Sequence, residues 1–348
     1  MSSLVCGLDV HKDSVYATVM NYGGEIVDKR KLTNDEVVNF LSRYPIDKVA
    51  MESSTSVVPV YRALRGKGYE ILVSHPKKTR LIAESRIKTD RVDSWAVTEL
   101  ARLDALPLSY MPPDDIAALR EKVRRRAFLV RMRSKLKVKI KAQLVVNGFT
   151  PPSEHGLFTS KGLEWLRSLQ LDAVDSYLPV ISTLDIQVGK LSRELRSLAS
   201  GDEDVRLLMT IPGIGYYSAL LVKSEIGSID RFPDGEKLCS YAGLVPSVSI
   251  SGKYRRHGSI TKEGSRWLRW IMVESVHTHL KYDTSITRAY HAIAERKGTQ
   301  IAKVAAARRL LMCCYSVLRS REPYHDPAGQ YQPSRSGRGE MLRRPTAS

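Results

Sequence analysis

Four carboxylates in the first third of the chain have the types and places that metal-dependent phosphoryl chemistry needs. Asp9, in the run GLDVHK, ends the first expected strand, and Glu52, in MESS, ends a later apolar strand. Asp90 and Asp93 lie three residues apart at the start of an expected helix, so their side chains share one face. Carboxylate oxygens gathered at one sheet edge suit Mg²⁺, or else Mn²⁺, and two such ions can polarise a phosphodiester and stabilise its attacking and leaving oxygens.

Each of these carboxylates also has an ordinary explanation when it is considered alone. An acidic residue at a strand end is more often a cap or a solvated side chain, and Asp90 is a good helix N-cap. What favours a metal site is their joint placement: after the first strand, after a later strand and on a following helix. The prediction therefore rests on the set and not on any one member.

A serine in the last third of the chain is a candidate nucleophile. Ser251 directly precedes Gly252 in a segment rich in cations, namely Lys253, Arg255, Arg256, Arg266 and Arg269. A serine hydroxyl attacks phosphorus poorly unless cations stabilise the developing charge and a base accepts its proton, and this segment supplies the cations. A serine beside a glycine is usually a turn residue, and three other serines compete for the role: Ser247, Ser249 and Ser259.

Residues 205–227 read as two apolar helices joined by the tight turn Pro212-Gly213-Ile214-Gly215, a helix-hairpin-helix pattern. Gly213 and Gly215 would let backbone N–H groups approach a nucleic-acid phosphate, and the start of the second helix adds a favourable dipole. A purely structural helical hairpin is the alternative. The basic composition favours nucleic-acid binding.

Residues 114–146 predict one long helix with a strongly basic surface. Apolar residues recur at three- and four-residue steps, and almost no acidic side chain follows Glu121. Such a surface is either simply solvated or binds nucleic acid, and the scarcity of acidic partners favours nucleic acid. The residues that we expect to contact it are Arg124, Arg125, Arg131, Lys135 and Lys139.

A second helical stretch has an apolar seam with heptad spacing. Its members are Ile181, Leu184, Val188, Leu191, Leu195 and Leu198. The seam is only about two and a half heptads long, so packing on the basic helix or a contact between two copies would each bury it. We expect a helical coiled-coil arm that also takes part in oligomerisation.

The elements that position these groups follow from the pattern of the chain. Strands are expected at 4–9, 14–20 and 24–32, and helices alternate with strands from there to residue 75. Three meandering strands followed by βαβ units are the order of an RNase H-like fold, a mixed sheet with helices on its faces. The expected organisation is this α/β domain over 1–110, the basic helical arm over 111–203, a mostly helical domain over 204–320 and a disordered tail over 321–348.

The charge of the chain points to a polyanionic partner. Its 348 residues carry 55 Lys and Arg against 37 Asp and Glu, a formal net charge of +18. Nucleic acid is favoured over a membrane surface, because no apolar run reaches about 18 residues and the N-terminal sequence lacks a secretory pattern. Four cysteines without CxxC spacing fit a reducing compartment, so we expect a cytoplasmic protein that does not bind membranes.

A resemblance to a known family rests on six runs of the sequence: GLDVHK, MESS, KTDRVDSWA, IPGIG, YAGLVPS and SGKYRRHGSITKEGSRWLR. Together these runs are similar to the DEDD transposases of the IS110 insertion-sequence family, relatives of the Piv site-specific DNA invertases, over roughly residues 3–320. The resemblance implies a RuvC-like first domain, a coiled-coil region and a second, transposase domain. Carried over by position, the metal-binding carboxylates are Asp9, Glu52, Asp90 and Asp93, and Ser251 is the serine of the family's SG motif, taken as the recombination nucleophile.

The resemblance also implies a mechanism and partners. The serine forms a transient phosphoserine link to DNA, assisted by Mg²⁺ and the carboxylates of another protomer, and strands are exchanged without net loss of phosphodiester bonds. A non-coding bridge RNA pairs donor DNA with target DNA. The protein works as dimers that assemble into tetramers, in the bacterial cytoplasm at the nucleoid.

Two other functions stay open on the residues alone. A metal-dependent Holliday-junction resolvase or nuclease would use only the carboxylates and would form no covalent protein–DNA species. A non-catalytic nucleic-acid scaffold with a relic domain would keep every activity in an Asp9→Asn variant. His277 and His279 point to different sides of a helix and make a poor zinc pair, so we expect them to be packing residues.

Overall fold

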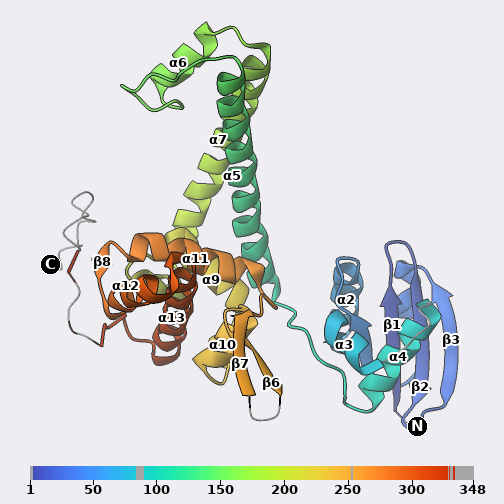
Figure 1. Ribbon diagram of the computed structural model, residues 1–348. Helices are drawn as coiled ribbons and strands as arrows, with labels where there is room; N and C mark the ends of the chain where they lie inside the picture. The colour runs from blue at the N-terminus through green and yellow to red at the C-terminus, as the bar shows by residue number, and fades with distance from the viewer. Residues whose placement is uncertain (1–2, 84–89, 252–253, 328, 330–331, 334–348) are drawn as a thin grey trace. The chain divides into compact units, whose positions relative to one another are not determined.

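The structure, a computed structural model, describes residues 3–83, 90–251, 254–327, 329 and 332–333, and for residues 80, 81, 83, 90–93, 248–251, 254–257 and 332–333 it describes the backbone alone. The chain divides into two compact units, Met1–Pro112 and Pro113–Ser348 (Figure 1). Within the residues described, no helix is both long and apolar enough to cross a bilayer.

The N-terminal unit is built on a five-stranded mixed sheet, as the sequence predicts. Its strands are β1 (Leu4–Val10), β2 (Val15–Asn21), β3 (Ile26–Leu32), β4 (Ile46–Glu52) and β5 (Glu70–Ser74), in the order β3-β2-β1-β4-β5. The meander β1-β2-β3 is antiparallel, whereas β4 runs parallel to β1 and β5 runs parallel to β4. The carboxyl ends of β1, β4 and β5 therefore lie at one edge of the sheet.

Helices cover both faces of this sheet because the central strand β1 is apolar and buried on both of its faces. The helical segments are η1 (Asn34–Glu36), α1 (Val37–Leu41), α2 (Val57–Arg65), α3 (Pro76–Ala83) and α4 (Asp90–Arg102). One face packs Leu8 and Met51 with Phe40 of α1, in a cluster that also includes residues of α2. The other face packs Val5 and Ala50 against α4. The two-residue period of a strand decides which of its residues face α4.

The C-terminal unit begins with two long helices that lie side by side, joined through a short third helix (Figure 1, green). They are α5 (Asp114–Val146), α6 (Ser160–Ser168) and α7 (Asp172–Ser200). In α7 the predicted seam is buried as far as Leu195, but Leu198 is 44% exposed and Ala199 is buried in its place. A straight helix has 3.6 residues per turn, whereas a heptad seam repeats every 3.5 residues. The seam therefore rotates away from the line of contact toward the end of the helix.

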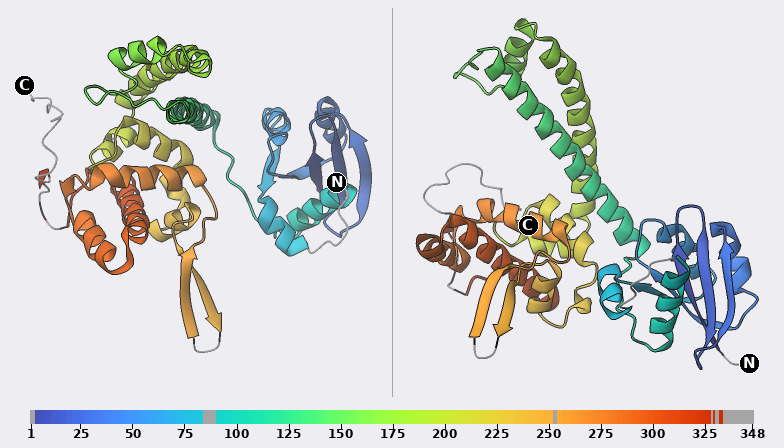
Figure 2. Two further views of the ribbon diagram at one scale, coloured as in Figure 1. Left: turned by 45° about the horizontal axis from the view of Figure 1, so that its top comes forward. Right: turned by 45° about the vertical axis from the view of Figure 1, so that its right-hand side comes forward.

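A bundle of shorter helices follows, and the right view of Figure 2 shows the pair α5–α7 extending from it. Its elements are α8 (Glu203–Met209), α9 (Tyr216–Ile226), η2 (Ile229–Arg231), α10 (Gly235–Tyr241), α11 (Arg266–His279), α12 (Ser285–Lys297) and α13 (Thr299–Ser320). Side-chain caps begin several of them: the side chains of Asp202, Asp234, Ser265 and Thr284 each accept a backbone N–H of the first turn.

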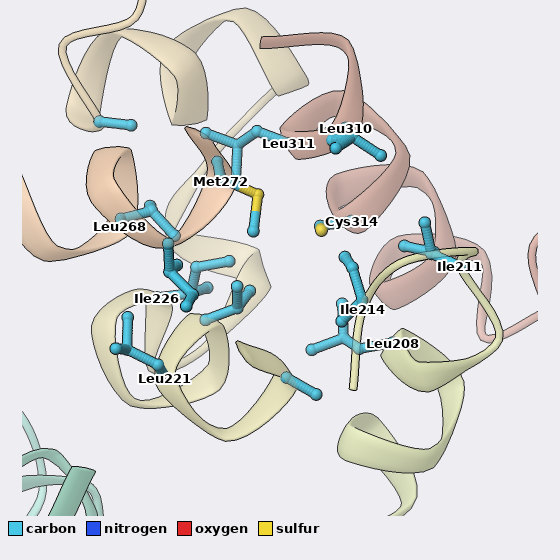
Figure 3. Close-up of a cluster of buried hydrophobic side chains, with 14 of the residues drawn as sticks. Leu208, Ile211, Ile214, Leu221, Ile226, Leu268, Met272, Leu310, Leu311 and Cys314 are labelled. Carbon is cyan, nitrogen blue, oxygen red and sulfur yellow. The ribbon is translucent and has the colours of Figure 1, made fainter. Parts of the chain in front are cut away.

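The core of this bundle joins residues that are far apart in the sequence (Figure 3). Leu221 and Ile226 of α9 pack with Leu268 and Met272 of α11, and α13 closes the cluster with Leu310, Leu311 and Cys314. Leu208 of α8 joins the cluster, together with Ile211 and Ile214 from the connection between α8 and α9. The apolar hairpin predicted over 205–227 therefore lies at the centre of the domain.

Two strands that the sequence analysis does not predict form a hairpin that projects from the bundle: β6 (Pro246–Ser251) and β7 (Tyr254–Ile260) (Figures 1 and 2). A further short pair, β8 (Tyr282–Asp283) and β9 (Gln332–Pro333), is antiparallel. In the sequence, β6 alternates serines with Val248 and Ile250, a short strand pattern that was passed over because the serines read as turn residues, whereas β7 (YRRHGSI) has no apolar alternation.

Within the segment expected to be disordered from residue 321, residues 321–327 make defined contacts. The Tyr324 N–H donates to Thr210 Oγ1 over 2.8 Å, and the buried Asp326 accepts from the Ser285 N–H over 2.9 Å. Asp326 thus supports the start of α12. Composition did not reveal these contacts, because the segment is held by a few specific hydrogen bonds instead of by an apolar face.

Candidate functional site

Asp9 and Glu52 are neighbours at the carboxyl edge of the sheet. The register of the parallel strands pairs Leu8 with Met51, so the next residue of each strand, Asp9 and Glu52, continues the same row. Both residues are partly buried. The two strand-end carboxylates predicted from the sequence are therefore together.

Both carboxylates belong to the face of the sheet that α4 covers. Val5 and Ala50 pack against α4, and residues two positions further along a strand point to the same face. Along β1 this row is Val5, Gly7 and Asp9, and along β4 it is Ala50 and Glu52. The opposite rows, with Leu8 and Met51, fill the other core.

The closeness of α4 to β1 depends on Gly7. A Cβ atom at Gly7 would lie 2.1 Å from Thr98 Oγ1 and 2.5 Å from the Ser94 carbonyl oxygen, so only glycine lets the helix backbone approach so closely. Buried hydroxyls fix the contact, since Ser94 Oγ and Thr18 Oγ1 lie 3.0 Å apart and Thr98 Oγ1 donates to the Ser94 carbonyl over 2.7 Å.

The direction of α4 brings its first turn to the edge that holds Asp9. At the other end of the helix, Arg102 donates to the Tyr22 carbonyl at the end of β2, which is the opposite edge of the sheet. Ser94 of α4 and Gly7 of β1 are in contact. From this contact, Asp90 lies four residues back along the helix, about 6 Å, and Asp9 lies two residues on along the strand, about 6.6 Å. The backbone of α4 at Asp90 and Asp93 thus lies near Asp9 and Glu52.

The side chains of Asp90 and Asp93 lie outside the described residues, so the structure leaves their part in the site as a prediction. Among the side chains that it does describe, no three acidic, histidine or cysteine residues form a metal-binding group. Asp9 Oδ2 lies 3.3 Å from His11 Nε2, and the Asp9 side chain is 18% exposed. Two half-buried carboxylates on adjacent strands are a donor set that suits a hard divalent cation.

Ser251 is the last residue of β6, at the far end of the hairpin, where its backbone pairs with that of Tyr254. The side chains of Ser249, Ser251, Arg255 and Arg256, and the whole of Lys253, lie outside what the structure describes. Of the competing serines, Ser247 is exposed and its hydroxyl donates to the Ser259 carbonyl over 2.9 Å. Ser247 is therefore already used in the hairpin.

The structure sorts the predicted nucleic-acid contacts by the partners they have. Arg124 Nη2 lies 2.7 Å from Oε1 of the buried Glu225, and Arg269 donates to the Ala242 carbonyl over 2.7 Å. Burial lowers the pKa of Arg269. Several other predicted contacts are solvent-exposed: Arg125, Arg131, Lys135, Lys139 and Arg266.

Glu225 is a structural residue that sequence reasoning missed. Its carboxylate also accepts from Ser265 Oγ over 2.8 Å, so it joins α5, α9 and the start of α11. Arg131 of α5 lies over the rings of Trp267 and Trp270, at 4.9 Å and 5.1 Å from their centroids. The sequence did contain a signal for the role of Glu225: it is the single acidic residue in the apolar helix 216–226, and a basic helix elsewhere in the chain could supply its partners.

The two glycines of the predicted helix-hairpin-helix turn differ in their surroundings. Gly213 has φ +84°, and a Cβ there would lie 2.6 Å from the His279 backbone nitrogen, so its close approach is to α11. Gly215 is exposed, and its N–H donates to Ser218 Oγ over 3.0 Å. Of the two, Gly215 is the glycine with open space around it.

Comparisons with known proteins connect these features with a function. A family described as "Transposase IS116/IS110/IS902 family" matches residues 205–292, and a DEDD transposase family of the IS110 type matches residues 6–147. A transposase for insertion sequence element IS1111A from Coxiella burnetii is 26% identical over 334 residues, which cover 92% of this chain and 91% of that protein. A probable family 20 transposase from Pseudomonas aeruginosa is 23% identical over 333 residues, covering 92% of this chain and 98% of that protein.

Two further matches are more limited. A pilin gene-inverting protein from Moraxella bovis is 29% identical over 171 residues, 46% of this chain and 50% of that protein. Among solved structures, Thermus thermophilus RuvC in complex with a Holliday junction substrate matches 31% of this chain and 99% of its own, with 12% identity and a TM-score of 0.26. On the two family matches and the nearly full-length relatives, this chain is an enzyme that belongs to the IS110 family of DNA transposases.

Proposed function

We propose that this chain excises and inserts an insertion sequence by strand exchange, using two chemical centres. The first is a divalent-metal site formed by Asp9, Glu52, Asp90 and Asp93, and the second is the nucleophile Ser251. The observation that carries the proposal is that the carboxyl ends of β1 and β4 and the first turn of α4 meet at one edge of the sheet. The sequence places all four carboxylates there.

Bound at these carboxylates, Mg²⁺ or Mn²⁺ supplies Lewis acidity to the scissile phosphodiester. The protein's contribution is to hold the carboxylates in fixed positions. Asp9 and Glu52 are fixed by the sheet, and α4 is fixed by the Gly7 contact and by the buried hydroxyls of Thr18 and Thr98. This rigidity supports a preorganised site.

In the serine step, Ser251 Oγ attacks phosphorus, and the bond from phosphorus to a DNA oxygen breaks. The serine proton passes to a base, and the DNA strand leaves with a hydroxyl end, so one phosphoester bond is exchanged for another. A hydroxyl end of a second strand then attacks the phosphoserine and restores the serine. Lys253, Arg255 and Arg256 are the cations closest in sequence for the charge on phosphorus.

The partners that we propose are donor DNA, target DNA and a non-coding bridge RNA, bound by an oligomer in which carboxylates and serine come from different protomers. The projecting β6–β7 hairpin supports this arrangement, because it carries Ser251 at the end away from its own bundle (Figure 2). The exposed cations of α5 supply phosphate contacts.

The direct test is to look for the covalent species. Purified protein is incubated with element-end DNA, bridge RNA and Mg²⁺, and SDS-stable protein–DNA adducts are mapped by mass spectrometry. We expect phosphoserine at residue 251 in the wild type and in the control Ser247→Ala, and no adduct in Ser251→Ala. Hydrolysed DNA without an adduct in the wild type would instead identify a metal-dependent nuclease or resolvase.

A further inference from the structure

Ser74 ends β5 beside the carboxylate pair. The parallel register pairs Glu52 with Ser74, so the row at the carboxyl edge of the sheet reads Asp9, Glu52, Ser74 across β1, β4 and β5. Leu72, two residues before Ser74, packs with the cluster that contacts α4. Ser74 therefore faces the same side of the sheet as both carboxylates.

The backbone around Ser74 is held from both sides. Its carbonyl accepts from the Ser53 N–H over 3.0 Å, and the His75 N–H donates to the Pro107 carbonyl over 2.8 Å. The Ser109 N–H donates to the Val73 carbonyl over 2.7 Å. The backbone position of Ser74 is thus fixed by the fold.

The hydroxyl itself is buried without a partner. Ser74 has no exposed surface, and within the part of the chain that the structure describes its Oγ makes no hydrogen bond. A buried hydroxyl that makes no hydrogen bond costs about 1–3 kcal/mol of folding free energy. An alanine would avoid this cost, so the serine calls for an explanation other than stability.

We infer that Ser74 is a positioning residue for Glu52 in the metal site. When a divalent cation shared with Asp9 binds, the unpartnered Ser74 hydroxyl would donate a hydrogen bond to a Glu52 carboxylate oxygen and so orient that carboxylate toward the ion. This inference rests on the proposed metal function of the carboxylates. Partners of this kind orient metal-binding carboxylates in many proteins, and their loss weakens metal binding about 10- to 100-fold.

The test compares Mn²⁺ binding to the full chain, measured by electron paramagnetic resonance of the free ion, with thermal unfolding in the presence of a chelator. For Ser74→Ala we expect about tenfold weaker Mn²⁺ binding, together with an unfolding temperature equal to or above that of the wild type. Ser74→Thr keeps the hydroxyl and is expected to bind Mn²⁺ within about threefold of the wild type.

Ser224→Ala is the matched control, since Ser224 is also fully buried but its hydroxyl donates to the Leu221 carbonyl over 2.9 Å. It is expected to lower the unfolding temperature and leave Mn²⁺ binding unchanged. If the wild type binds Mn²⁺ and Ser74→Ala binds it equally well, the role of Ser74 is refuted while the metal site stands. If the wild type binds no Mn²⁺, or Asp9→Asn and Glu52→Gln bind it normally, the proposed metal site itself fails.

Discussion

His279 shows how much a single buried side chain does in the helical domain. It has no exposed surface, and its Nδ1 and Nε2 each lie 2.7 Å from a polar oxygen, the Pro212 carbonyl and Thr284 Oγ1 respectively. A carbonyl only accepts, so Nδ1 carries a proton and donates it to the Pro212 carbonyl, while Thr284 Oγ1, which lies against Nε2, donates to Thr287 Oγ1 over 3.1 Å. The prediction that His279 is a packing residue agrees with this environment, whereas His277, also expected to pack, is exposed with its Nε2 3.0 Å from Lys303 Nζ.

This arrangement predicts acid sensitivity. Burial lowers the pKa of His279 below its usual 6.5, against the opposing effects of the Pro212 carbonyl and the Asp326 charge. The unfolded chain therefore binds the proton more readily, and stability falls as pH drops below about 6.5, by at most about 1.4 kcal/mol per pH unit. Urea unfolding between about pH 7.5 and pH 5.5 should show this loss for the C-terminal unit.

The matched variants are His279→Gln, which should be less stable at neutral pH but flatter with pH, and His277→Gln, which should behave like the wild type. A His279→Gln variant with the full acid-dependent loss would contradict the assignment.

Among the elements, α4 decides whether the carboxylates converge. The sequence predicted its start and the strands that end in Asp9 and Glu52, because strand ends and helix starts are marked by local sequence. It did not predict that α4 crosses β1 over Gly7, since that contact depends on the tertiary path of the chain. The β6–β7 hairpin was missed for a different reason: only two apolar residues, Val248 and Ile250, mark β6, and β7 has no apolar alternation.

Gly7→Ala tests the crossing. Its methyl group would meet Thr98 Oγ1 and the Ser94 carbonyl, so α4 must shift away from the sheet. We expect a loss of about 1–3 kcal/mol in the stability of the N-terminal unit and weaker Mn²⁺ binding. Gly66→Ala is the control, because the nearest atom to its Cβ is 3.5 Å away. Equal stability and Mn²⁺ affinity for the Gly7 and Gly66 variants would refute the close crossing as the basis of the site.

At the scale of the whole molecule, the two units have separate cores and the arm belongs to the second of them. Val123 of α5 lies in the core of the helical domain, and Tyr217 of α9 donates to its carbonyl over 2.8 Å. From the sequence we expected a separate arm over 111–203. The docking of α5 on α9 was not predicted, since it depends on the tertiary contact of Glu225 with its cationic partners. Part of the basic charge therefore stabilises the fold.

The remaining charge predicts a steep dependence of nucleic-acid binding on salt. A net charge of +18 and the exposed cations of α5 and α11 imply several phosphate contacts, each adding about −0.9 to the slope of log K against log salt. Binding of element-end DNA measured between about 50 and 200 mM salt should fall at least a hundredfold. A flat response would remove the electrostatic argument, and Lys135→Gln with Lys139→Gln should reduce the slope by about two.

The most direct test of the two-centre account uses cells that carry the gene with its native flanking DNA. Excision is scored by PCR across the rejoined ends for the wild type, Ser251→Ala and Asp9→Ala, at matched protein levels. We expect the wild type to give the junction product and both variants to lose it. A junction product from Ser251→Ala, with none from Asp9→Ala, would contradict the serine assignment and leave an enzyme that works through its carboxylates alone.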